Sequence, residues 1–230
     1  MVKFVDTELN YLKKEVSEMW TLVYDQMEQA RNAVLNLDVD ISNHIIAREK
    51  RVNAFDLKID SDVEDFITLY NPVAIDLRFA LAILNINSNL ERIGDYADSM
   101  ARYVLRSQGE PIDKVLFVEL RLEEMFNQML YMLSTAQRAL NEENVDLAKS
   151  VLEKDTLLDE INYDSTRILA NYTVQHPDMA KQCFDLTSIF RKVERTGDHI
   201  GNIVEEIVFY IDARVLKHRK SEDYDLHREE

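Results

Sequence analysis

The sequence contains few residues that break or turn a helix. It has only 4 glycines and 3 prolines among 230 residues, whereas the two together make up about 12% of an average protein. Sandwiches, barrels and doubly wound sheets need frequent turns, and glycine and proline supply many of them. The shortage therefore excludes most β architectures and favours a few long helices.

Thiols and long apolar runs are also scarce. The single cysteine, Cys183, has no second cysteine with which to form an internal disulfide, and this fits a reducing cytoplasm. Residues 1–6 lack the apolar stretch of a signal peptide. No uncharged apolar run approaches the roughly 20 residues of a membrane span. We therefore expect a cytoplasmic protein without direct membrane insertion.

Basic residues are outnumbered. Lys and Arg total 27 against 43 Asp and Glu, which gives a formal net charge of −16. Such a surface repels phosphate backbones and anionic lipid, so we expect no nucleic-acid partner. It attracts cations and basic protein surfaces instead.

Apolar residues recur at helical spacing along almost the whole chain, and one such seam occurs twice. The first copy is Ile83, Ile86, Leu90, Ile93, Ala97, Met100 and Val104. The second copy, 103 residues later, is Leu186, Ile189, Val193, Thr196, Ile200, Ile203 and Ile207. Polar residues repeat as well, because Leu-Glu-Arg-Ile-Gly-Asp at 90–95 becomes Val-Glu-Arg-Thr-Gly-Asp at 193–198. We interpret the chain as a tandem duplication.

The predicted fold is all-α, with two three-helix bundles and six long helices. The domains expected are a first bundle over 1–108, a second over 109–213 and a charged tail over 214–230. The expected helices span 5–37, 40–69, 72–107, 111–141, 144–175 and 177–213. Gly109 and Pro111 indicate the boundary between the bundles, and Pro72 and Pro177 indicate helix starts.

Each repeated segment carries an acidic stripe. Residues four apart on a helix share a face, so Glu91 lies beside Asp95, and Glu194 beside Asp198. At 100° per residue the stripes lie more than about 120° from the apolar seam. We therefore expect them to face outward, unlike a buried di-iron centre, which also needs a Glu-x-x-His motif that the chain lacks.

The middle helix of each half offers a companion pair, and neighbouring middle and third helices would join the stripes into one groove per bundle. The first-bundle candidates are Glu49, Asn53, Glu91 and Asp95, with Asp98 or Ser99 beside them. The second-bundle candidates are Asp155, Asp159, Glu194, Asp198 and Asn202.

Clustered carboxylates repel one another unless cations bridge them. All-oxygen ligands suit hard or borderline ions, and we expect iron, manganese, magnesium or zinc here, although a structural tetrahedral zinc site is not favoured. The alternative is a solvated helix face with i,i+4 ion pairs, in which Arg92 and Arg195 orient the carboxylates. Gly94 and Gly197 beside the stripes allow either close helix packing or room for a metal or partner.

Three segments resemble a known family. Pro-Val-Ala-Ile-Asp-Leu-Arg at 72–78 and Leu-Glu-Arg-Ile-Gly-Asp-Tyr-Ala at 90–97 resemble the first signature of PhoU-type phosphate-uptake regulators. Val-Glu-Arg-Thr-Gly-Asp-His-Ile-Gly-Asn at 193–202 resembles the second. The resemblance implies two pseudo-symmetric bundles, each with a multinuclear metal site, in a cytoplasmic, often homodimeric, non-enzymatic regulator that restrains the phosphate starvation response. Its implied partners are the ATPase subunit of the phosphate ABC transporter and a phosphate-sensing histidine kinase.

The sequence departs from the family pattern in the first bundle, where Asn53 replaces a carboxylate and Ser99 replaces an asparagine. We therefore expect more metal in the second bundle. Asp76 and Arg78 belong to an Asp-Leu-Arg triplet that matches the family and has no counterpart in the second half. They serve either packing or a partner contact. The alternative function is a metal-dependent enzyme, a phosphatase or oxidase, that uses the same stripes. Against it, no acid, base or nucleophile lies in an evident pocket.

Overall fold

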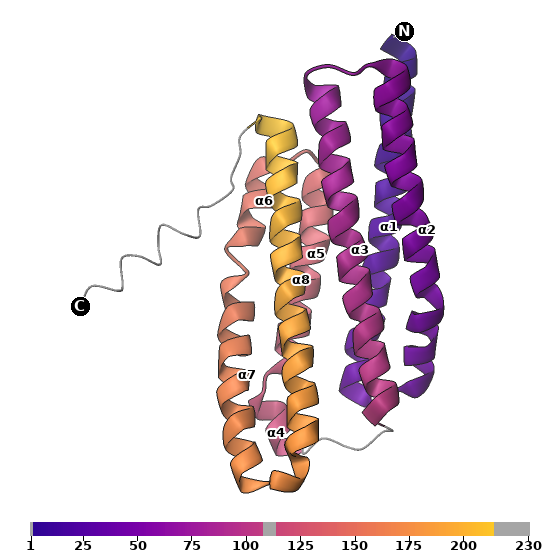
Figure 1. Ribbon diagram of the computed structural model, residues 1–230. Helices are drawn as coiled ribbons and strands as arrows, with labels where there is room; N and C mark the ends of the chain where they lie inside the picture. The colour runs from indigo at the N-terminus through magenta and orange to yellow at the C-terminus, as the bar shows by residue number, and fades with distance from the viewer. Residues whose placement is uncertain (1, 108–113, 214–230) are drawn as a thin grey trace, which may run out of the picture.

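The structure, a computed structural model, describes residues 2–107 and 114–213. Within these ranges it contains helices and no strand (Figure 1). The first bundle consists of α1 (Val2–Asn36), α2 (Val39–Tyr70) and α3 (Ile75–Ser107). The second consists of α4 (Lys114–Glu119), α5 (Leu122–Asn141), α6 (Val145–Leu152), α7 (Thr156–Gln175), the 3-10 turn η1 (Pro177–Met179) and α8 (Ala180–Asp212). The predicted all-α fold with six long helices is confirmed.

Several predicted helix bounds are wrong. The helix expected over 111–141 is divided between α4 and α5 at Arg121, whose φ of 53° lies in the left-handed region. The helix expected over 144–175 is divided between α6 and α7 by a turn at 153–155. Pro72 does not begin a helix, because Ala74 has a φ of 51° and α3 starts at Ile75. Residues 108–111 and 214–230, where we expected the bundle boundary and the tail, lie outside the described residues.

Side chains close the ends of several helices. The Asp38 carboxylate accepts a hydrogen bond of 2.9 Å from the backbone N–H of Ile41 and so caps α2. Asn144 caps α6 in the same way, accepting from Leu147 N–H at 3.0 Å. At the other end of α2, Asn71 adopts the left-handed conformation that commonly ends a helix. These caps fix where the chain reverses between neighbouring helices.

The two bundles share one continuous apolar core. Both copies of the repeated seam are buried in it, as shown by Leu90, Ile93, Val193 and Ile200, which are all fully buried. The third helices, α3 and α8, pack along each other at the centre of the molecule, and α1 packs against α5 (Figure 1). Trp20 of α1 is fully buried there. The acidic stripes of both bundles are therefore carried by the helices at the centre of the molecule.

Contacts at one end of the molecule also join the bundles. Arg78 of α3 donates to the backbone carbonyl of Tyr210 in α8 at 3.4 Å. Arg78 therefore serves packing between the bundles, which was one of the two roles that the sequence left open. None of the described helices combines the length and the apolar composition needed to span a membrane.

Candidate metal-binding sites

A glycine in each third helix brings the middle helix close. A Cβ atom on Gly94 would lie 3.1 Å from Val52 Cγ1 of α2. A Cβ atom on Gly197 would lie 2.6 Å from Leu158 Cδ1 and 2.7 Å from Asp155 Oδ1. Both glycines thus permit close helix–helix packing, and at Gly197 the space is shared with a carboxylate of the candidate site.

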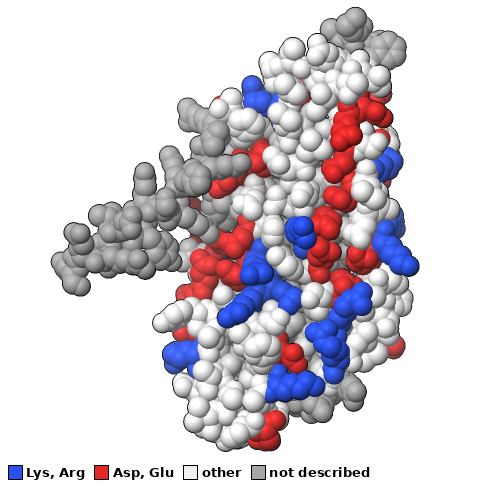
Figure 2. Space-filling view, in the orientation of Figure 1, with Lys and Arg blue, Asp and Glu red and all other residues white. Residues whose placement is uncertain are grey.

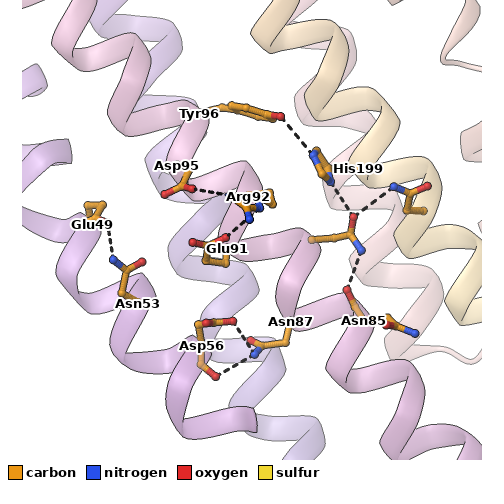
Figure 3. Close-up of polar contacts among 12 residues, drawn as sticks. Glu49, Asn53, Asp56, Asn85, Asn87, Glu91, Arg92, Asp95, Tyr96 and His199 are labelled. Carbon is orange, nitrogen blue, oxygen red and sulfur yellow. Dashed lines mark hydrogen bonds and ion pairs between the residues drawn. The ribbon is translucent and has the colours of Figure 1, made fainter.

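The first-bundle carboxylates of α2 and α3 lie near one another (Figure 3). Burial raises the pKa of Glu91, and the negative charges of Asp95, Asp56 and Glu49 raise it further. Electrostatic repulsion acts over several ångströms, so these charges need only lie in the same region between α2 and α3. The structure thus brings Glu49, Glu91 and Asp95 together, as the stripes predict, and adds Asp56 to them.

Two carboxylates and an amide of this site were missed by the sequence analysis. Asn87 of α3 is fully buried and donates to Asp56 Oδ1 at 2.9 Å (Figure 3) and to Asp60 Oδ1 at 2.9 Å. Its own Oδ1 is buried without a hydrogen-bond partner among the described residues. The signal available in the sequence was the four-residue spacing of Asp56 and Asp60, the same spacing as Glu91 and Asp95.

Neighbouring side chains already form ion pairs or hydrogen bonds with some of the first-bundle carboxylates. Arg92 lies 3.6 Å from Glu91 Oε2 and 3.5 Å from Asp95 Oδ2, which confirms the local ion pairs predicted for Arg92. The amide of Asn53 donates to Glu49 Oε1 at 2.5 Å. These contacts are local pairings within one helix, of the kind that the sequence analysis kept as the alternative to a metal, although the ion pairs of Arg92 join adjacent residues and residues three apart and not residues four apart.

The second-bundle carboxylates form a similar group. Burial raises the pKa of Glu194, and the charges of Asp198, Asp159 and Asp155 raise it further, in that order. Asp155 is only 6% exposed, because it lies in the turn that divides α6 from α7 and is directed at Gly197. Asp159 and Asp198 are exposed.

The expectation that both stripes face outward is therefore wrong in part. Asp155 is buried, and Glu91 and Glu194 are only partly exposed. The helical-wheel angle was measured from the seam alone, but α3 also packs against α2, and α8 also packs against α7. A residue turned away from the shared core is thus still covered on one side by the middle helix.

Asn202 lies in a different polar cluster from the one predicted for it. Its amide donates to Asn89 Oδ1 at 3.4 Å, and His199 Nδ1 lies 2.8 Å from the same oxygen. His199 Nε2 lies 3.4 Å from the hydroxyl of Tyr96 (Figure 3). Burial and the charges of Arg92 and Arg195 lower the pKa of His199. This neutral cluster joins α3 to α8.

Both acidic groups offer oxygen atoms, which are the metal ligands that a hard cation prefers. Carboxylate oxygens dominate, and the orphaned Asn87 Oδ1 is a further oxygen donor close to Asp56 and Asp60. The raised pKa values of Glu91 and Glu194 express a repulsion that a cation would relieve. Among the described residues, however, no three His, Cys, Asp or Glu side chains are already arranged to hold a metal ion. The metal sites stay a prediction.

Known proteins resemble this chain over nearly its whole length. A family model described as the PhoU domain matches it twice, over residues 16–104 and 122–207. Phosphate-specific transport system accessory protein PhoU homolog 1 of Thermotoga maritima is 28% identical over 212 residues, which cover 92% of this chain and 90% of that protein. The accessory protein PhoU of Escherichia coli K12 is 28% identical over 222 residues, covering 96% and 90%.

Solved structures show the same fold. The crystal structure of PhoU from Pseudomonas aeruginosa matches with a TM-score of 0.86 and 26% identity, over 91% of this chain and 99% of that one. That of the phosphate transport system regulatory protein PhoU from Streptococcus pneumoniae matches with a TM-score of 0.82 over 92% and 99%, and its 24% identity supports the fold alone.

Proposed function

This chain belongs to the PhoU family, and on that premise we propose that it is an accessory protein that regulates phosphate uptake. One observation carries the proposal. The PhoU domain matches both halves of the chain, and the similarity covers about nine-tenths of relatives named as accessory proteins of the phosphate-specific transport system. The duplication, and not one motif, is therefore shared with them.

The finer proposal is that the protein is a cytoplasmic adaptor, acting as a homodimer. It would dock on the ATPase subunit of a phosphate ABC transporter and on a phosphate-sensing histidine kinase, and so restrain the phosphate starvation response. The net charge of −16 supports docking on basic partner surfaces. Complementary charge steers such partners together and raises the association rate.

The acidic groups supply a place for regulation by metal. Glu49, Asp56, Glu91 and Asp95 would hold a cation between α2 and α3. Asp155, Asp159, Glu194 and Asp198 would hold one between α7 and α8. A bound cation supplies positive charge that offsets the repulsion among these carboxylates. Carboxylates from neighbouring segments would then bind the same cation, and the cation would set the distance between the two helices at the protein surface.

Deletion of the gene tests the regulatory role. The deletion strain should express phosphate-starvation genes, or take up phosphate without restraint, in phosphate-rich medium. Purified protein should bind the transporter ATPase or the kinase, and the binding should weaken as salt rises from about 0.05 to 0.5 M, because the Debye length falls severalfold.

Charge reversal provides a matched pair of variants for that binding. Glu153 is exposed in the turn beside Asp155, whereas Glu119 is exposed in α4. Glu153→Lys should weaken binding more than Glu119→Lys, although both change the net charge equally. Normal repression in the deletion strain, together with turnover of phosphate esters by the metal-loaded protein, would replace the adaptor with the metal-dependent enzyme.

A further inference from the structure

A cavity lies where the end of α3 meets the start of α8, toward the lower end of the molecule in Figure 1. Its volume is about 260 Å³. Tyr103 and Arg106 of α3 line one side, and Asp178 of η1 with Lys181 and Asp185 of α8 line the other. Cavities that hold drug-sized ligands measure about 300–1,000 Å³, so this one has room for a smaller molecule. Because α3 and α8 belong to different bundles, such a molecule would contact both.

The hydroxyl of Tyr103 has no partner within the part of the chain that the structure describes. The side chain is 3% exposed, and its oxygen is buried without a hydrogen bond. Burial raises the pKa of this hydroxyl to about 12, and the negative charge of Asp185, on the wall of the same cavity, contributes to the rise. Leaving a buried polar group unsatisfied is unfavourable. A molecule in the cavity that Tyr103 lines would supply the missing hydrogen bond.

The lining of the cavity also carries charges of both signs. Arg106 and Lys181 are exposed, Asp178 is exposed, and Asp185 is partly exposed. None of the ion pairs formed among the described residues includes any of these four side chains. Figure 2 shows Lys and Arg concentrated over the lower half of this face, with a few Asp and Glu among them. Two cations and two carboxylates therefore line one cavity without forming ion pairs.

The opposite end of the α3–α8 pair shows groups of the same kinds already satisfied. There Arg78, which lies 103 positions before Lys181, donates to the backbone carbonyl of Tyr210 at 3.4 Å. The hydroxyl of Tyr210 donates to Glu143 Oε1 at 2.8 Å. The fold can therefore pair a cation and a tyrosine hydroxyl at a junction of these two helices. The unpaired groups around Tyr103 are thus particular to this cavity.

We propose that this cavity between α3 and α8 is a binding site for a small zwitterion, namely a free amino acid. The α-carboxylate pairs with Arg106 and Lys181, and the α-ammonium pairs with Asp185. The Tyr103 hydroxyl donates to the carboxylate. A ligand that carries one charge alone would leave the opposite set of side chains unpaired and would be repelled by the like charges. The site does not depend on the regulation of phosphate uptake proposed above.

Thermal unfolding of the full chain in the presence of each standard amino acid in turn tests the proposal. A ligand that binds only the folded state raises the unfolding midpoint. Exclusion of a solute from the protein surface also raises midpoints, but it does so equally in variants that differ by one hydroxyl. The informative variant is Tyr103→Phe, which removes only the unpartnered hydroxyl. The matched control is Tyr163→Phe, because Tyr163 is exposed in α7.

At least one amino acid should bind the parent protein and Tyr163→Phe equally, and titration calorimetry should show binding to Tyr103→Phe weakened by about tenfold. Without ligand, Tyr103→Phe should unfold at the same or a higher temperature than the parent, because it loses a buried group that has no partner. The N-acetyl and amide derivatives of the amino acid that binds each lack one charge, and both should bind more weakly than the amino acid itself.

Three results would overturn the proposal. The first is that no amino acid binds the parent protein. The second is that Tyr103→Phe and Tyr163→Phe bind the amino acid equally well, because the hydroxyl would then not contact it. The third is a lower unfolding midpoint for ligand-free Tyr103→Phe, which would show that the hydroxyl is already satisfied in the free protein.

Discussion

Gly197 of α8 leaves just enough room for the Asp155 carboxylate, because a Cβ atom at position 197 would lie 2.7 Å from Asp155 Oδ1. The glycine therefore does two things at once. It lets α7 approach α8, and it gives a nearly buried carboxylate a place at the edge of the second acidic group. Packing and the candidate metal site are coupled at this one contact.

Gly197→Ala should lower stability. An alanine favours an exposed helix interior over glycine by about 1 kcal/mol, but here its Cβ would displace Leu158 and Asp155, and overpacking costs about 1–3 kcal/mol. Gly201→Ala, in the same helix, is the matched control, because its Cβ would lie 3.7 Å from its nearest neighbour, Leu152. Thermal unfolding should show a lower midpoint for Gly197→Ala and an equal or higher one for Gly201→Ala. Equal midpoints would contradict the packing argument.

The second bundle should hold more metal than the first. Each group has four carboxylates, but in the first group Asn53 donates to Glu49, whereas the corresponding position in the second group is the carboxylate Asp159. Protein purified without chelator should lose more metal through Asp198→Ala than through Asp95→Ala, as measured by elemental analysis. Glu18→Gln in α1 serves as the control for loss of a surface carboxylate. Equal losses would refute the asymmetry, and a metal-free parent protein would refute the sites.

The fold should survive removal of the metal. Apart from Thr196, the seams of both bundles consist of buried apolar side chains that do not involve the acidic groups, and a core of this size holds a domain without metal. After chelation, the helical circular-dichroism signal should remain. Its collapse would show that the metal is structural, as in small zinc domains.

Glu194 should destabilise the metal-free protein near neutral pH. Its pKa in the folded state is raised from 4.5, so the folded protein binds a proton more readily than the unfolded chain. Stability from this group is therefore present at low pH and is lost as pH rises through the raised pKa. Metal-free Glu194→Gln should unfold at a higher temperature than the parent at pH 7, and the difference should shrink as pH falls toward 4.5. A constant difference across that range would exclude the electrostatic cause.

The ion pair between Lys13 of the first bundle and Glu143 of the second should contribute modestly to the free energy of unfolding. Lys13 Nζ lies 2.7 Å from Glu143 Oε1, and the Tyr210 hydroxyl donates to the same oxygen at 2.8 Å. Hydrogen bonds from Lys13 and Tyr210 lower the pKa of Glu143, so its contribution is present above 4.5 and is lost as pH falls through the lowered value. Because the pair is half-exposed, Glu143→Gln should cost about 0.5–1 kcal/mol.

The adjacent Glu142 provides the control for that pair. It lies 3.5 Å from Arg138 within a single turn of helix and joins no second bundle. Glu142→Gln should change the free energy of unfolding, measured by urea denaturation at pH 7, by less than Glu143→Gln does. The reverse order would show that Glu143 does not connect the bundles.

Much of this molecule follows from local sequence. The shortage of glycine and proline, the helical spacing of apolar residues and the repeat at 103 residues predict an all-α duplication, because these patterns act within single helices. The same logic places Glu91 beside Asp95 and Glu194 beside Asp198, since residues four apart share a helix face. The ion pairs of Arg92 with its neighbours are equally local.

Other features were decided only when helices packed. Asp56 joins the first acidic group because α2 runs beside α3, and Asp155 is buried because a break between α6 and α7 turns it toward Gly197. The Tyr96 hydroxyl and His199 Nε2 lie 3.4 Å apart across the two bundles although 103 positions separate these residues in the chain. Sequence periodicity determines which face of a helix is polar, but the exposure and the neighbours of that face depend on every other helix that packs against it.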